Sequence, residues 1–109
     1  MLNQEQIDAV KAKHAGKDLH LVTVNLDDQE LEFVCVSPGK AQISKYLQEV
    51  SDAGQEFRAA ENFVLSCTVH PERKELQAMF DKHPLIITTL NKDLEKKAGF
   101  GAKSTSKKL

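Results

Sequence analysis

The sequence lacks the features of a membrane, secreted or disulfide-stabilised protein. No apolar run approaches the roughly 20 residues that a transmembrane helix needs. The opening Met1-Leu2-Asn3-Gln4-Glu5-Gln6 has neither the basic region nor the apolar core of a signal peptide. Cys35 and Cys67 are too few for a disulfide scaffold and cannot by themselves form a thiolate zinc site. These absences predict a reduced, intracellular protein with no membrane span.

What the sequence does contain is typical of one folded domain. Its 109 residues are 40% hydrophobic and 28% charged, with five glycines and three prolines, a composition of globular rather than disordered chains. This length supports one hydrophobic core but not two. We expect a single domain over residues 1–100 and a disordered tail over residues 101–109, where the residues are small, polar and basic.

The period of the apolar residues predicts strands in the first third of the chain. Leu19–Leu26 and Leu31–Val36 are rich in β-branched residues, and a short polar segment separates them. This pattern predicts an antiparallel β-hairpin. Before it, Asn3 and Gln6 have the spacing of a capping box, which predicts a helix from about Asn3 to His14.

Four helices are predicted after the hairpin from apolar residues at helical spacing. They are expected to begin with Ser37 as N-cap, at about Gln55, at Pro71 and at Pro84. The fold class is therefore α+β, with an N-terminal helix, one hairpin and a cluster of four short helices. The helical residues expected in the core are Ile43, Leu47, Phe57, Ala60, Val64, Cys67, Leu76, Phe80, Ile87 and Leu90.

No pattern in the chain indicates catalysis, a cofactor or a metal. The four histidines include no pair four residues apart, and none is close in sequence to a cysteine. Cys35 and Cys67 lie among apolar residues, as buried and unreactive cysteines do. The sequence Gly99-Phe100-Gly101-Ala102-Lys103-Ser104-Thr105 lacks the spacing and the preceding strand of a P-loop. We therefore expect a protein that is not an enzyme, unless a histidine and a carboxylate converge in a closed pocket.

The second half of the chain carries features that recur in one known family. They are a helix that ends near Pro71, an acidic helix from Glu72 to Asp81, a Phe80-x-x-x-Pro84 step and a last apolar helix that ends in Ala98-Gly99-Phe100. With the preceding hairpin, they make residues 18–100 resemble the tail assembly chaperones and tail-completion proteins of long-tailed bacteriophages and prophages. The resemblance implies a protein of the bacterial host cytoplasm that binds the aggregation-prone tape-measure protein, or another tail protein, while the tail is assembled.

The charge is unevenly distributed, which leaves a second function open. Residues 91–109 hold six lysines against two acids, so they carry +4 of a total of −1 and the first ninety residues carry −5. Lys103, Lys107 and Lys108 form the basic tail, which is either a solubilising terminus or an arm that contacts an acidic partner or nucleic acid. The alternative function is a small nucleic-acid-associated regulator, although the acidic body and the absence of a recognition motif argue against nucleic acid.

The hairpin predicts self-association. A two-stranded ribbon is marginally stable alone and needs cover on its apolar faces. Helices of one small domain are expected to cover one face, and the N-terminal helix could cover part of the second. The sequence therefore predicts a homodimer or higher oligomer that extends the sheet from edge to edge. The residues expected at its interface are Val22, Val24, Leu26, Val34 and Val36.

Overall fold

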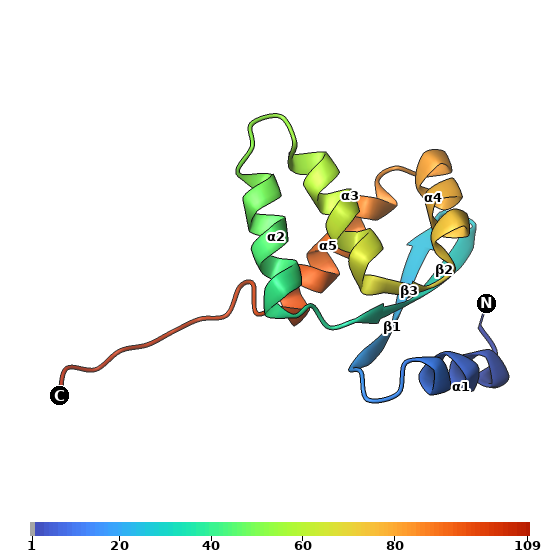
Figure 1. Cartoon of the computed structure of the whole chain (residues 1–109), viewed down its shortest axis with the longest axis horizontal. Helices are drawn as coiled ribbons and strands as arrows, with labels where there is room; N and C mark the ends of the chain where they lie inside the picture. The colour runs from blue at the N-terminus through green and yellow to red at the C-terminus, as the bar shows by residue number, and fades with distance from the viewer. Residues whose placement is uncertain (1) are drawn as a thin grey trace.

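The computed structural model describes residues 2–109 and has the predicted α+β architecture (Figure 1). A helix precedes a hairpin, and four helices follow it. The elements are α1 (Gln4–Lys13), β1 (Leu19–Leu26), β2 (Gln29–Val36), α2 (Lys40–Val50), α3 (Glu56–Cys67), β3 (Thr68–His70), α4 (Arg73–Lys82) and α5 (Ile86–Lys97).

The three strands form one antiparallel sheet in the order β1-β2-β3. The predicted hairpin is confirmed, and Leu19 pairs with Val36 at its open end. The short strand β3, in contrast, is not predicted by the sequence. It follows α3 directly and pairs with β2 at Val34 and Cys35, where the register shifts. Three residues are too few to show the alternating period of a strand. Thr68–His70 is a strand because it pairs with β2.

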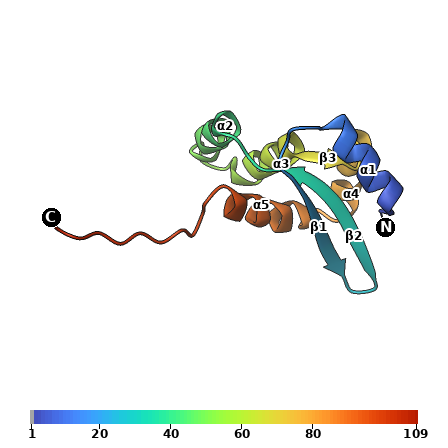
Figure 2. The same ribbon diagram turned by 90° about the horizontal axis from the view of Figure 1, so that it is seen from below.

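The core lies between one face of the sheet and helices α3, α4 and α5 (Figure 2). Phe33 and Cys35 of β2 are fully buried in it. The predicted helical core residues that are buried are Ala60, Val64, Cys67, Leu76, Phe80, Ile87 and Leu90. The apolar stripes of these three helices therefore face a common centre, as their spacing predicts.

The predicted burial of two other residues is wrong. Leu47 of α2 is 57% exposed and Phe57 of α3 is 49% exposed, while Ile43 is only half-buried. Helix α2 packs against α3 at the rim of the domain, so only one side of its apolar stripe has a covering element. Phe57 lies in the first turn of α3, where no neighbouring helix covers it fully.

Three of the predicted helix starts lie two residues too early. Gly39 rather than Ser37 is the N-cap of α2, and its N–H donates to Gln42 Oε1 over 2.8 Å. Helix α4 begins at Arg73 instead of Pro71. Pro84 forms a single turn before α5, because its carbonyl accepts from the N–H of Ile87 at 3.1 Å. Prolines here stand in the entry turn and not in the helix. The Asn3 capping box of α1 is confirmed.

The hairpin register corrects the predicted interface. Val34 pairs with Leu21, and Val36 pairs with Leu19. Residues that pair directly share one face of a sheet, so Val34 and Val36 lie on the face opposite to Val22, Val24 and Leu26. The latter three pack in or against the core. The five residues therefore do not form one surface.

Helix α1 partly covers the second face of the sheet, as one of the alternatives predicted. Ile7 and Val10 are half-buried and line a small cavity of about 60 Å³ with Leu19, Leu21 and Val34. The N–H of Leu2 also donates to Glu32 Oε1 over 3.0 Å. The cover is light, because no residue of α1 is fully buried.

The chain leaves the domain after α5 as an extended tail (Figures 1 and 2). Residues 102–109 form neither helix nor strand and are exposed throughout. Disorder of this tail stays a prediction. None of the helices within residues 2–109 has the length and apolar character required to cross a bilayer.

Candidate partner-binding site

A shallow apolar groove runs along the exposed side of α2. Its volume is about 500 Å³, and its apolar lining comes from Pro38, Ile43, Leu47 and Ala98. Pro38 precedes α2, whereas Ala98 follows α5, so the groove lies where the two helices meet. Leu47 is more than half exposed beside these apolar residues, and contiguous exposed apolar surface marks binding sites when it is extensive. We call these four residues, with Lys40 at the rim, the α2 groove.

Tyr46 explains why this side of α2 remains open. Its ring stacks on Phe63 of α3, its hydroxyl donates to Glu95 Oε2 at 3.4 Å, and that hydroxyl accepts from Asn91 Nδ2 at 3.2 Å. One residue thus anchors α2 to both α3 and α5. Leu47 follows Tyr46 by one position, about 100° further around the helix, and this rotation directs it away from the anchored side.

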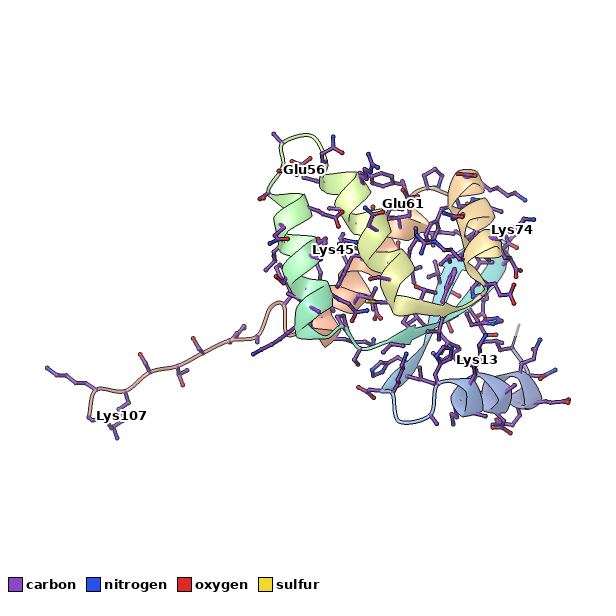
Figure 3. All side chains as sticks on the ribbon, viewed as in Figure 1. Lys13, Lys45, Glu56, Glu61, Lys74 and Lys107 are labelled. Carbon is purple, nitrogen blue, oxygen red and sulfur yellow. The ribbon has the colours of Figure 1, made fainter. Side chains whose placement is uncertain are left out.

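Basic groups lie at the same end of the molecule as the α2 groove. Lys40 lines the groove, and Ala98 of the groove leads within five residues to Lys103. Lys107 lies far out on the tail (Figure 3). The tail lysines Lys103, Lys107 and Lys108 are exposed and take part in none of the ion pairs among residues 2–109. An apolar groove flanked by lysines suits an acidic amphipathic partner.

The structure brings together a serine, a histidine and an aspartate that the sequence analysis did not connect. Ser37 Oγ donates to Asp18 Oδ2 over 2.7 Å, and His20 Nε2 lies 2.7 Å from Ser37 Oγ and 3.2 Å from Asp18 Oδ2. The pairing of Leu19 with Val36 places the flanking Asp18 and Ser37 opposite each other. The register of β1 against β2, if it had been predicted, would therefore have brought these three residues together at the level of the sequence.

This cluster does not have the geometry of a catalytic triad. In a triad the serine proton goes to histidine, and the aspartate binds the other ring nitrogen. Here the serine donates to the aspartate, and both oxygens share Nε2. Asp18 is largely exposed instead of enclosed. The N–H of Ser37 also donates to the carbonyl of Asp18 at 3.0 Å, so the cluster closes the open end of the hairpin.

Comparison with known proteins places the chain in a family. The family described as a domain of unknown function, DUF6848, matches residues 10–107. The chain belongs to this family. No curated protein matches the chain.

The DUF6848 domain also has a counterpart among solved structures. The structure of the uncharacterised protein rbstp2171 from Bacillus stearothermophilus superimposes with a TM-score of 0.76. The two sequences are 21% identical over 93% of this chain and 99% of the other. At this identity, the likeness establishes a shared fold.

The DUF6848 domain also carries two thiols and three further histidines. Both thiols are buried, and burial raises the pKa of Cys35 to about 11 and raises the pKa of Cys67. No three histidine, cysteine or acidic side chains within residues 2–109 are placed to hold a metal ion. His14, His70 and His83 lie at the ends of different elements.

Proposed function

We propose that this DUF6848 protein is a non-catalytic binding protein of the bacterial cytoplasm that acts as a phage or prophage tail assembly chaperone. The exposed Leu47 in the α2 groove carries this proposal. A chaperone for an aggregation-prone client has to present apolar surface while remaining folded. The groove does so on a helix that Tyr46 anchors independently.

The proposed client segment is an acidic amphipathic helix of the tape-measure protein or another tail protein. A helix laid in a groove buries its apolar side against residues such as Ile43 and Leu47. Acidic residues on its flank would approach Lys40 and the tail lysines Lys103, Lys107 and Lys108. Because these lysines are exposed, the electrostatic contribution is screened by salt. Binding is therefore expected to weaken as the ionic strength rises.

Titration calorimetry with segments of the tape-measure protein tests this proposal. Leu47→Lys places a charge in the groove and is expected to weaken binding at least tenfold. It should leave the unfolding midpoint almost unchanged, because the side chain is already exposed. Phe57→Lys is the matched control, since Phe57 is similarly exposed on α3 but does not line the groove. Equal binding by Leu47→Lys and wild type would show that the groove is not the site.

Removal of the tail distinguishes this function from the nucleic-acid alternative. A variant that lacks residues 101–109 is expected to bind the client more weakly at low salt and equally at high salt. Neither the full chain nor the shortened chain should be retained on DNA at low salt. Salt-dependent DNA binding that disappears with the tail would instead support the regulator. Failure of every tape-measure segment to bind would contradict the chaperone proposal.

A further inference from the structure

The outer edge of β1 is an unprotected strand edge. β1 lies at the end of the sheet, and no strand within residues 2–109 pairs with its outer side. Natural proteins protect such edges with lysine, proline, bulges or short strands. The eight residues of β1, Leu19-His20-Leu21-Val22-Thr23-Val24-Asn25-Leu26, include no lysine, acid or proline. Their pairing with β2 is also regular throughout.

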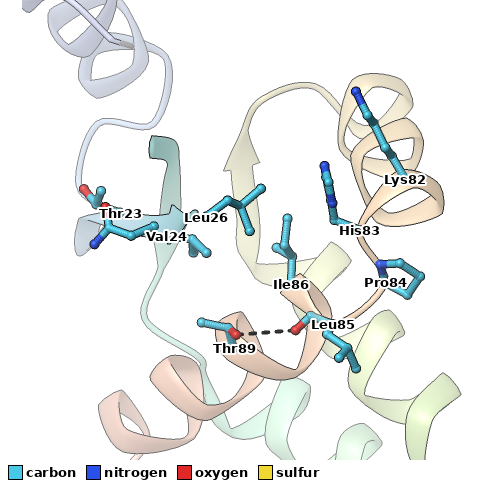
Figure 4. Close-up of a pocket in the computed structure, with 10 residues that line it drawn as sticks. Thr23, Val24, Leu26, Lys82, His83, Pro84, Leu85, Ile86 and Thr89 are labelled. Atoms are coloured by element: carbon cyan, nitrogen blue, oxygen red, sulfur yellow. Dashed lines mark hydrogen bonds between the residues drawn. The ribbon is translucent and has the colours of Figure 1, made fainter. Parts of the chain in front are cut away.

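A cleft runs beside the second half of this edge (Figure 4). Its volume is about 580 Å³, and it lies between Thr23–Leu26 of β1 and the turn that joins α4 to α5. Leu85, on the lip of the cleft, is 75% exposed. A strand added here could bond to the unpaired backbone groups of β1 on one side of the cleft. On the other side it would meet the exposed Leu85 of the turn between α4 and α5.

We propose that the occupant is β1 of a second copy of this chain, paired antiparallel around a two-fold axis at Val22. The two three-stranded sheets then form one continuous sheet, and the interface is the same surface in both copies. This interface uses the edge of β1 and not the α2 groove, so the proposal stands or falls independently of the chaperone function.

Two constraints favour an axis at Val22 over its neighbour at Thr23 and over any axis between residues. Opposed residues must face the same side of the sheet, which requires the axis to pass through a residue and not between residues. An axis at Val22 places Leu21 opposite Thr23 and Lys17 opposite Asp27 of the second copy. An axis at Thr23 would instead oppose Asp18 to Asp28, which puts like charges together at both ends.

The cleft walls fit this arrangement. With the axis at Val22, Asp18 of the second copy lies opposite Leu26, which lines the cleft together with Lys82 and His83. The backbone pairing thus brings a negatively charged residue, still bonded to Ser37 of its own copy, next to a cleft that is lined by a lysine and a histidine. Each copy also brings Leu85 toward the other, so the apolar lip is covered.

Charge reversal at the opposed positions gives a sharp test by sedimentation equilibrium. Wild type is expected to have twice the 12.2 kDa chain mass at micromolar concentration. Lys17→Asp places the new aspartate opposite Asp27 of the second copy at both ends of the interface. Asp27→Lys places the new lysine opposite Lys17 of the second copy at both ends. Each variant should therefore self-associate about tenfold more weakly at low salt, since a few exposed charges have modest effects. Mixing the two variants should restore dimers as heterodimers, because both ends are then complementary.

A charge placed on the edge itself tests the strand pairing. Thr23→Lys mimics natural edge protection and is expected to abolish the dimer. Thr105→Lys, which adds the same charge on the exposed tail, should not change it. Circular dichroism with an unchanged unfolding midpoint would establish that Thr23→Lys still folds. A wild-type monomer at all accessible concentrations, a dimer that survives Thr23→Lys, or a mixture no tighter than its components would overturn the proposal.

Discussion

The rings of Tyr46 and Phe63 stack with their centroids 4.5 Å apart and their planes at 21°. This stacking of aromatic rings contributes beyond simple burial and ties α2 to the core helix α3. Because the Tyr46 hydroxyl also bonds to Asn91 of α5, the position of α2 depends on a few specific contacts and not on a deep apolar face. The side of α2 that carries Leu47 is thereby left open.

Removal of the Tyr46 hydroxyl is expected to destabilise the domain. In Tyr46→Phe, the buried Asn91 amide loses its hydrogen-bond partner, which costs about 1–2 kcal/mol in the free energy of unfolding. Adding Asn91→Leu should recover most of this loss, since both polar groups are then absent. Urea denaturation of the two single variants and the double variant measures the coupling. Additive effects would show that the hydrogen bond contributes little.

Truncation of core and groove residues should have very different costs. Phe80 is 2% exposed within the core, so Phe80→Ala is expected to cost about 3–5 kcal/mol. Leu47→Ala removes an exposed side chain and should stay within about 0.5 kcal/mol of wild type. Chemical denaturation of both variants checks this contrast. A large loss in Leu47→Ala would place that side chain in the core and remove it from the binding surface.

The closing cluster of the hairpin predicts a pH effect. The hydrogen bond from Ser37 and the charge of His20 lower the pKa of Asp18 below its ordinary value of 3.8. The stabilisation from the ionised carboxylate is therefore fully present above pH 3.8 and is lost as the pH falls through the lower, folded-state pKa. In Ser37→Ala the pKa of Asp18 should rise toward 3.8. Titration of the carboxyl carbon signal by NMR measures the change.

The two thiols are expected to resist modification while the domain is folded. Burial raises the pKa of Cys35 from 9.0 to about 11, so its thiol stays protonated near neutral pH. A thiol-specific chromogenic reagent at pH 8 should label neither Cys35 nor Cys67 until denaturant is added, when both react. Because the folded-state pKa is raised, the protonated Cys35 thiol contributes fully to the free energy of unfolding below pH 9. That contribution is lost as the pH rises through about 11. Rapid labelling of the native protein would contradict this burial.

Local sequence was sufficient for the elements whose residues repeat a clear period. Alternating β-branched residues predicted both strands of the hairpin, and the spacing of Leu76 and Phe80 or of Ile87 and Leu90 predicted the buried sides of α4 and α5. Asn3 and Gln6 predicted a helix start because a capping box acts within one turn. The helix starts predicted near proline were wrong by up to two residues. Proline is tolerated both in the turn that precedes a helix and in the first turn of the helix itself, so the sequence does not distinguish the two positions.

Tertiary structure alone decided the features that now carry the functional proposals. Apolar residues at helical spacing show which residues share one side of a helix. Whether that side is buried depends on the neighbouring elements, so Leu47 was predicted to lie in the core but is exposed. The strand β3 exists through its pairing with β2, and the contact of Asp18 with Ser37 depends on the hairpin register. The free edge of β1 and the cleft beside it follow from strand order, which sequence period does not encode. The period of a sequence is a local property, whereas cover, register and edges arise from contacts between distant segments.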